Sequence, residues 1–147
     1  MILWRATRHP SLDGNGGLRV SGRWHTRGRR IVYCAPNPAT ALLELLVHAE
    51  IDLEDLPTTF RYLEIEAPDS LATERVGEGA LVSAGENEST RQWGDNWLRA
   101  GRTALLQVPC ALVPATWNTL LNPEHPDSGQ IRIARIHRLA MDPRLRR

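Results

Sequence analysis

The segment from about Ala39 to Glu50, ATALLELLVHAE, constrains the fold of this chain more than any other. Its residue pattern predicts a helix that is apolar almost all round, and such a helix must be covered by the rest of the protein. Asn37 is expected to cap this helix, and Pro38 is expected to occupy its first position. The chain must therefore fold around a buried helix.

Three polar side chains interrupt the apolar surface of this helix along one stripe. Thr40, Glu44 and His48 are spaced at i, i+4 and i+8, so they lie on one face. An unpaired charge in such a place costs several kcal/mol, so the carboxylate of Glu44 needs a partner or a cleft. Two interpretations stay open: Glu44 pairs with an arginine for a structural reason, or it forms the wall of a cleft.

Most of the other predicted elements are short strands, which outnumber the helices and do not alternate regularly with them. This arrangement favours an α+β fold over a doubly wound sheet. The length of 147 residues is typical of one domain, so residues 1–147 are expected to form one compact core. Residues 67–88 are predicted to be a surface loop with at most one short turn of structure. The predicted strands are Ile2 to Arg5, Ile31 to Ala35, Phe60 to Glu66, Thr103 to Val108, Ala111 to Val113 and Ile131 to His137.

A second helix is predicted from about Thr90 to Ala100, and Gly101 is expected to end it. Trp93 and Trp97 lie one turn apart on this helix. Large aromatic side chains at this spacing usually pack together into a core, so both are expected to anchor the helix. We assign them no chemistry.

The composition is that of an ordinary globular protein, with 41% hydrophobic and 24% charged residues. No window approaches the roughly 18 to 20 unbroken apolar residues of a membrane span, and the start MILWRATRHP lacks an apolar signal-peptide core. We therefore expect a soluble, cytoplasmic protein without membrane contact. Cys34 and Cys110 are far apart and form no CxxC pair, and the histidines are scattered, so reduced thiols and no metal site are expected.

The charges are segregated along the chain although the net charge is only +1. All eighteen basic residues are arginine. Residues 1–35 carry seven arginines and one carboxylate, residues 36–95 three arginines and thirteen carboxylates, and residues 96–147 eight arginines and three carboxylates. The near-neutral total argues against a general nucleic-acid coat, so a local anion pocket fits better.

The segment DGNGGLRVSGRWHTRGRR combines glycines with arginines directly before a predicted strand. Glycine lets the backbone approach a ligand closely, and the planar fork of arginine suits phosphate oxygens. Neither a Rossmann fingerprint nor a P-loop is present. A flexible basic loop is the alternative. Tyr33 in the following strand could stack on a flat ring or simply pack.

The late stretch VPCALVPATWNTLLNPEHPD holds Cys110, Asn118, Asn122 and His125. Cys110 and His125 could form a Cys/His hydrolase site, but two residues establish no geometry, and cysteine is commonly a small buried hydrophobe. This hydrolase is one function class that stays open at this point, beside a non-enzymatic basic binding module.

Four ordered blocks together resemble the RES-domain family, the toxin components of bacterial RES/Xre toxin-antitoxin pairs. The blocks are WRATRHP, GLRVSGRWHTRGRRIVYCA, PATALLELLVHAE and VPCALVPATWNTLLNPEHPD, and they span nearly the whole chain. The family is named for an arginine, a glutamate and a serine. These map onto Arg23, onto Glu44 and onto the position of Cys110, where this chain has a thiol in place of the hydroxyl.

The resemblance implies a single compact α+β domain similar to the ADP-ribosyltransferases, and cleavage of NAD at the nicotinamide glycosidic bond by phosphorolysis or hydrolysis. ADP-ribosylation of a cellular protein is the alternative. In this interpretation Arg23 grips the pyrophosphate, Tyr33 stacks on the nicotinamide, and Glu44 stabilises the positively charged sugar of the transition state. His48 lines the same cleft, with Cys110 and Asn118 near the nicotinamide.

The resemblance also implies a protein partner, an antitoxin with an Xre-like and ParS-like region that covers the active site. A homodimer of the toxin within that complex is one expected arrangement. NAD is expected as substrate and inorganic phosphate as one acceptor. No prosthetic group and no direct binding of nucleic acid are expected.

Overall fold

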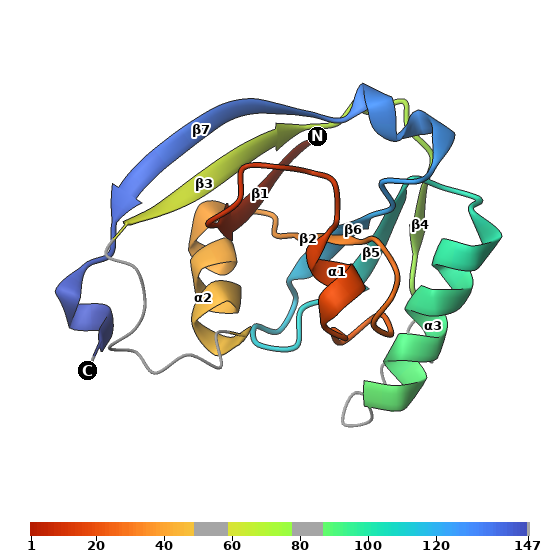
Figure 1. The fold of residues 1–147 in the computed structure, drawn as a ribbon, viewed down its shortest axis with the longest axis horizontal. Coiled ribbons are helices and arrows are strands. Elements are labelled where there is room, and N and C mark those ends of the chain that lie inside the picture. The colour runs from red at the N-terminus through yellow and green to blue at the C-terminus, as the bar shows by residue number, and fades with distance from the viewer. Residues whose placement is uncertain (49–58, 78–86, 147) are drawn as a thin grey trace.

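Two sheets form the framework of the molecule (Figure 1). The computed structural model describes residues 1–48, 59–77 and 87–146. The first sheet has the strand order β1-β3-β7 and is antiparallel. The second has the order β2-β6-β5-β4, in which β4 pairs parallel with β5 and the other pairs are antiparallel. The strands are β1 (Ile2–Thr7), β2 (Val32–Cys34), β3 (Thr59–Glu66), β4 (Thr73–Arg75), β5 (Leu105–Pro109), β6 (Trp117–Leu121) and β7 (Arg132–Ala140).

The two sheets meet where β1 passes the end of β2. The backbone N–H of Trp4 donates to the Ala35 carbonyl at 2.9 Å, and the Ala35 N–H donates back to Trp4 at 2.7 Å. Apolar side chains from both sheets, among them Leu63 and Leu105, pack in one cluster. This cluster joins the two sheets.

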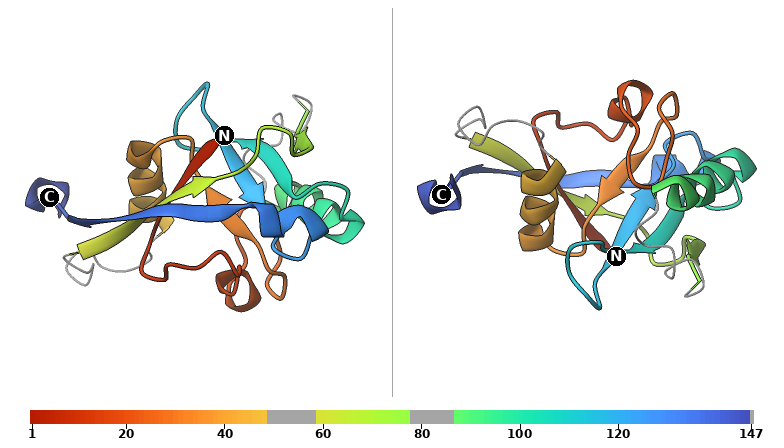
Figure 2. Two further views of the ribbon diagram at one scale, coloured as in Figure 1. Left: turned by 90° about the horizontal axis from the view of Figure 1, so that it is seen from above. Right: turned by 90° about the horizontal axis from the view of Figure 1, so that it is seen from below.

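Two long helices, α2 (Pro38–His48) and α3 (Asn87–Ala100), lie at opposite ends of the molecule (Figure 2). The segment that joins β1 to β2 lies on one side between them and contains the short helix α1 (Gly16–Arg19). Two 3₁₀ turns, Pro126–Gln130 and Pro143–Arg146, flank β7. Within the described residues no helix is long and apolar enough to span a membrane.

The α+β class expected from the sequence is confirmed. The expectation that the helix is covered on all sides is wrong, because α2 packs Leu42, Leu45 and Leu46 against the core and leaves Leu43 38% and Val47 53% exposed. The helix begins at Pro38, and Asn37 Oδ1 accepts a hydrogen bond from the Thr40 N–H at 2.8 Å, as expected of a cap. Its expected end at Glu50 lies outside the described residues. Gly101 ends α3 with a φ of +62°, a left-handed conformation that glycine adopts without strain.

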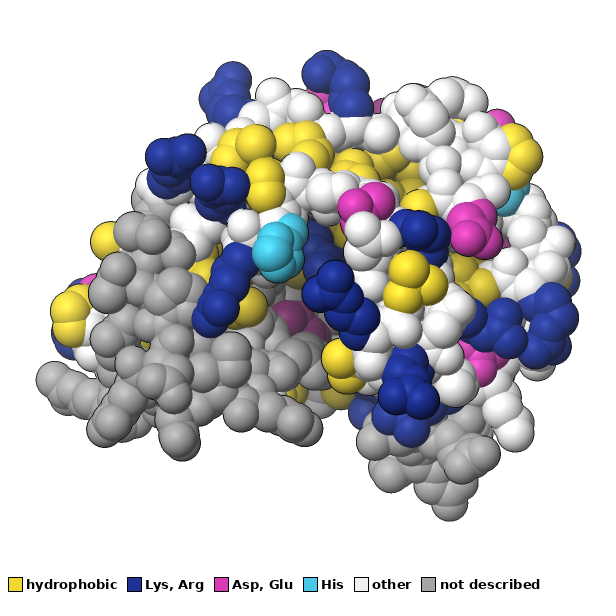
Figure 3. Space-filling model, viewed as in Figure 1, with side chains coloured by type: hydrophobic (Ala, Val, Ile, Leu, Met, Phe, Trp, Pro, Cys, Tyr) yellow, Lys and Arg dark blue, Asp and Glu magenta, His cyan; other side chains and the backbone are white. Residues whose placement is uncertain are grey.

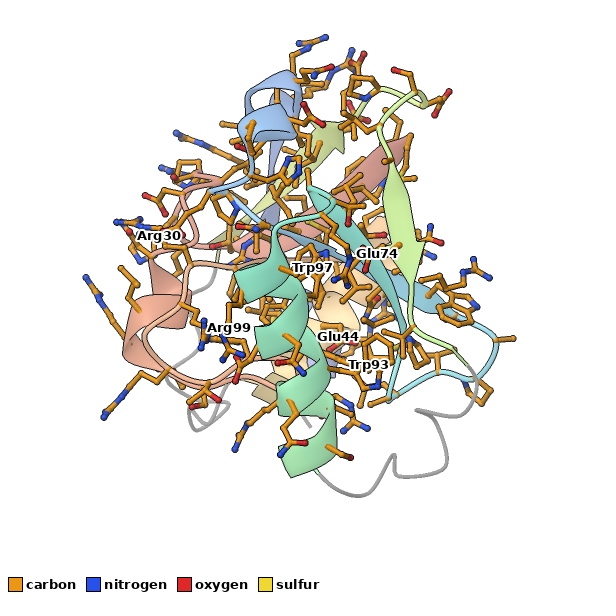
Figure 4. All side chains as sticks on the ribbon, turned by 90° about the vertical axis from the view of Figure 1, so that its right-hand side faces the viewer. Arg30, Glu44, Glu74, Trp93, Trp97 and Arg99 are labelled. Atoms are coloured by element: carbon orange, nitrogen blue, oxygen red, sulfur yellow. The ribbon has the colours of Figure 1, made fainter. Side chains whose placement is uncertain are left out.

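Three local predictions are wrong. Residues 111–113 form a bend, because the N–H of Cys110 donates to the Thr116 carbonyl at 2.8 Å and closes a loop there. The strand that follows β5 is β6, where the polar residues Asn118 and Thr119 interrupt the apolar pattern that would have predicted it. The segment 67–88 contains the strand β4, which pairs with β5. Trp97 is 1% exposed, as expected, but Trp93 is 42% exposed, because α3 presents only one face to the core (Figure 4).

Helix α3 holds the segment that follows α1 against the body of the protein. Arg91 Nε donates to the Gly22 carbonyl at 2.8 Å, and the Thr90 hydroxyl donates to the carbonyl of Arg23. Gly94 lies so close to Trp24 that a Cβ there would stand 1.6 Å from its carbonyl oxygen. The arginine singled out in the sequence is thus positioned by a helix about seventy residues away.

We expect Gly94→Ala to destabilise the protein by about 1–3 kcal/mol, the usual cost of overpacking. Alanine is the better helix former by about 1 kcal/mol, so any loss of stability must come from the clash with Trp24. Urea unfolding measures the free energy of unfolding. Gln92→Ala, at an exposed position of the same helix, is the matched control and should cost nothing. A Gly94→Ala variant as stable as the wild type would show that α3 does not rest on Trp24.

Candidate active site

The carboxylate of Glu44 is the centre of the candidate site. Helix α2 directs it toward β6 and the end of β5, and its Oε1 accepts two hydrogen bonds there. Asn118 Nδ2 donates at 2.8 Å, and Cys110 Sγ donates at 3.2 Å. Three residues that the sequence analysis proposed separately are therefore in direct contact.

The thiol of Cys110 acts here as a hydrogen-bond donor. Burial raises its pKa, and so do the hydrogen bond to Glu44 and the negative charge of that residue. A nucleophilic cysteine needs the opposite, a lowered pKa beside a base. His125 instead caps its own 3₁₀ turn, where its Nδ1 accepts from the Asp127 N–H at 3.0 Å. The geometry therefore disfavours a Cys/His hydrolase.

Two adjoining cavities, called the cleft below, open on either side of Glu44. One has a volume of about 230 Å³ and the other about 290 Å³. Figure 3 shows a hollow near the middle of one face, with basic and acidic side chains around it. Helix α3 covers Glu44 in the side view of Figure 4. The residues that line both cavities are Gly22, Arg23, Tyr33, Glu44 and Asn118.

The hydroxyl of Tyr33 is held by a buried network. It contacts His25 Nδ1 at 2.7 Å and accepts from the Trp24 N–H at 3.2 Å. His25 Nε2 faces the Val20 carbonyl at 3.0 Å, so this nitrogen carries the proton and Nδ1 accepts from Tyr33. Burial raises the pKa of Tyr33 and lowers that of His25. Only the ring of Tyr33 is therefore offered to a ligand.

Gly22 is required by this network. A Cβ at Gly22 would stand 2.4 Å from the Tyr33 hydroxyl oxygen. Glycine thus lets the segment that carries Arg23 pass directly over the Tyr33 ring edge, which brings both side chains to the same cleft.

The cleft also contains residues that sequence reasoning missed. Arg5, on β1, lines the first cavity, and its Nη1 donates to the Tyr33 carbonyl at 3.3 Å. Arg91 lines the second cavity beside its contact with Gly22. Arg5 lies in a strand and Arg91 in a helix, and nothing in the local sequence distinguishes either from an ordinary surface arginine. The position of Arg5 within the block WRATRHP was the available signal.

The side chain of Asn118 has one buried polar atom without a hydrogen-bond partner among the described residues. Asn118 Oδ1 is buried and accepts no hydrogen bond from the described residues, while the amide nitrogen of the same side chain is bound to Glu44. A buried carbonyl oxygen without a partner is costly, so a bound donor is expected there. His48, the other predicted cleft residue, ends α2, and its side chain lies outside the described residues.

Fold and site together define an α+β domain with a carboxylate at the junction of two small-molecule cavities. The RES domain family matches residues 2–142, and this chain belongs to that family, as the four sequence blocks indicated. It is similar to the "Toxin Res" of Pseudomonas putida, with 47% identity over 133 residues that cover 90% of this chain and 92% of that protein.

Two further comparisons agree. The "Prs ADP-ribosylating toxin" of a Sphingobium species is 36% identical over 140 residues, covering 91% of this chain and 86% of that protein. A chain in the crystal structure of the M. tuberculosis MbcT-MbcA toxin-antitoxin complex has the same fold, with a TM-score of 0.73 at 17% identity. The superposition covers 99% of this chain and 86% of that one.

The lowered pKa of His25 predicts that the folded protein loses stability in acid. Burial disfavours the charged imidazolium, and protonation would also remove the Nδ1 acceptor of Tyr33, so the unfolded chain binds the proton more readily. This contribution is complete above the ordinary histidine pKa of 6.5 and is lost as the pH falls below it toward the folded value. The expected slope is at most about 1.4 kcal/mol per pH unit.

Thermal unfolding between about pH 5 and 7.5 measures this dependence, because histidine titrates in that range. His25→Gln should flatten the curve, and His9→Gln, at an exposed histidine, should leave it unchanged. An equally steep curve in His25→Gln would assign the acid sensitivity to other groups.

Proposed function

We propose that this chain is the toxin of a toxin-antitoxin pair and that it destroys NAD by cleaving the nicotinamide glycosidic bond. The observation that carries the proposal is the carboxylate of Glu44, held by Asn118 and Cys110 at the junction of two cavities. The names of the relatives, a toxin and an ADP-ribosylating toxin, support the class of activity. A cytoplasmic antitoxin of the Xre/ParS type is the proposed partner.

Loss of nicotinamide leaves a sugar with oxocarbenium character, as in glycoside cleavage. A fixed carboxylate beside that sugar stabilises the developing positive charge more than it stabilises the neutral ribose of the substrate. Two donors on Oε1 fix the direction of the Glu44 carboxylate before the substrate arrives. In this mechanism Glu44 is the catalytic residue, and Asn118 and Cys110 are positioning residues.

Substrate binding is assigned to the basic and aromatic residues of the cleft. The ring of Tyr33 would stack on the nicotinamide, since its hydroxyl is held by His25. Arg23 would grip the pyrophosphate with its guanidinium fork, and Arg5 in the first cavity would add a second cation. Two adjoining cavities suit the two halves of a dinucleotide, with the bond to be cut beside Glu44. His48 remains a proposed cleft residue.

The acceptor of the ADP-ribosyl group follows from what else lines the cleft. Among the described residues of the two cavities, Glu44 is the one acidic side chain. Water and a protein nucleophile both usually lose a proton to a general base as they attack, whereas phosphate arrives already ionised. We therefore favour phosphorolysis over hydrolysis and over transfer to a protein. The name of the Sphingobium relative supports the alternative, ADP-ribosylation of a cellular protein.

Release of free nicotinamide from NAD by the purified chain tests the proposal. We expect Glu44→Gln to lower the rate by about 10²–10⁴-fold, because the amide keeps the shape but loses the charge. Glu124→Gln, which removes an exposed carboxylate, is the matched control and should keep the wild-type rate. Circular dichroism shows whether each variant is folded. A folded Glu44→Gln variant with most of the wild-type turnover would refute the assignment.

The same reaction, run with and without inorganic phosphate, identifies the acceptor. A phosphate-dependent rate that yields ADP-ribose phosphate indicates phosphorolysis, and free ADP-ribose indicates hydrolysis. Label transferred from NAD to one cellular protein at comparable efficiency would favour the ADP-ribosyltransferase.

Cys110→Ser separates a donor from a nucleophile at this position. We expect the variant to keep or raise NAD cleavage, because a hydroxyl can also donate to Glu44 Oε1 and the resemblance places a serine here. Cys110→Ala, which removes the donor, should lower the rate, typically by about tenfold for a lost hydrogen bond of about 1.4 kcal/mol. A covalent adduct trapped on Cys110 during turnover would contradict this role.

A further inference from the structure

A second basic cavity lies outside the cleft. Its volume is about 280 Å³, and Arg8, Arg61 and Arg138 line it together with Thr7 and Phe60. It shares no lining residue with the two cavities of the cleft. In Figure 3, basic side chains gather on the left of the face, over the end of the sheet formed by β3 and β7.

The sheet register forces two of these arginines together. Arg61 on β3 stands directly opposite Arg138 on β7 and opposite Thr7 on β1. Directly opposed residues have Cβ atoms about 4.5–5.5 Å apart, and like charges at such positions destabilise a sheet. The protein thus carries an electrostatic cost here that a bound anion would remove.

No carboxylate among the described residues neutralises these three arginines. Other arginines of the same strand do have acidic partners: Arg132 contacts Glu66 at 2.9 Å, and Arg135 contacts Glu64 at 3.8 Å. Both arginines that precede Arg138 on β7 therefore have a carboxylate of β3 beside them. Among the residues that the structure describes, the arginines of this cavity thus differ from Arg132 and Arg135 in having no carboxylate beside them.

The other walls suit a small anion. Phe60 is 3% exposed and Thr7 is 8% exposed, so the cavity has one buried apolar and one buried polar lining residue beside the arginines. The Thr7 hydroxyl accepts from the His9 N–H at 3.1 Å and keeps its own proton to donate. Arginine forks match the oxygens of phosphate, and a concave site of this volume suits a small ligand better than a flat macromolecular surface.

We propose that Arg8, Arg61 and Arg138 form a phosphate-binding site distinct from the cleft. Its ligand is a phosphate group, supplied by free inorganic phosphate or by the phosphomonoester of a nucleotide. The site is adjacent to the cleft along β1, where Ala6 lines the first cavity and Thr7 lines this one. This assignment does not depend on NAD cleavage.

Isothermal titration with inorganic phosphate at constant ionic strength, without NAD, tests the site. We expect saturable binding that Arg61→Gln and Arg138→Gln each weaken at least tenfold. Arg132→Gln removes the same charge from the same strand and should bind like the wild type. A nucleoside monophosphate that binds more tightly than phosphate identifies the nucleotide as the source, and equal affinities identify free phosphate.

Thermal unfolding gives an independent signature. In phosphate-free buffer Arg138→Gln should unfold at the same temperature as the wild type or higher, because the opposition to Arg61 is relieved. Phosphate should raise the unfolding temperature of the wild type and of Arg132→Gln but not that of Arg138→Gln.

Five outcomes would overturn the proposal. The first is absence of saturable phosphate binding. The second is equal weakening in Arg132→Gln, which indicates an effect of general charge. The third is retained binding in both Arg61→Gln and Arg138→Gln, which places the phosphate elsewhere.

The fourth is binding that appears only when Glu50, Asp52, Glu54 and Asp55 are changed to amides, which indicates that the chain's own carboxylates compete for the arginines. The fifth is preferential binding of an acidic peptide or a nucleic acid.

Discussion

The two hydrogen bonds to Glu44 Oε1 are the interactions on which the rest of the site depends. An apolar helix with one carboxylate is stable only if that group is paired or reaches a polar cleft, because an uncompensated buried charge costs several kcal/mol. Asn118 and Cys110 provide the donors, from β6 and from the end of β5. The contact therefore joins α2 to the second sheet at the point where the two cavities meet.

A second constraint holds Arg23 in the cleft that also contains Glu44. The segment around Gly22 has little regular structure of its own, yet Arg91 and Thr90 of α3 bind its carbonyls, and Gly94 allows the helix to approach Trp24. The backbone of Arg23 is thus held by the packing of α3 and by hydrogen bonds from that helix.

The protonation states of the site follow from burial. Tyr33 and Cys110 both have raised pKa values, so both keep their protons and serve as fixed contacts rather than as bases or nucleophiles. His25 is kept neutral and fixes the direction of the Tyr33 hydroxyl. In the proposed reaction electrostatic stabilisation by one carboxylate does the chemical work, and the remaining groups are set in place before the substrate binds.

The sequence by itself determined the apolar helix, its cap at Asn37 and the need to compensate Glu44, because helix periodicity and the cost of a charge on an apolar helix are local properties. It also indicated the family, because the four ordered blocks can be recognised in the sequence without any knowledge of tertiary contacts. Only the tertiary structure decided that Glu44 is bound by Asn118 and that Arg5 reaches the cleft, because strand pairing brings together residues that no local pattern relates. Long-range register likewise set Arg61 against its neighbour on β7, a juxtaposition that strand alternation alone does not encode.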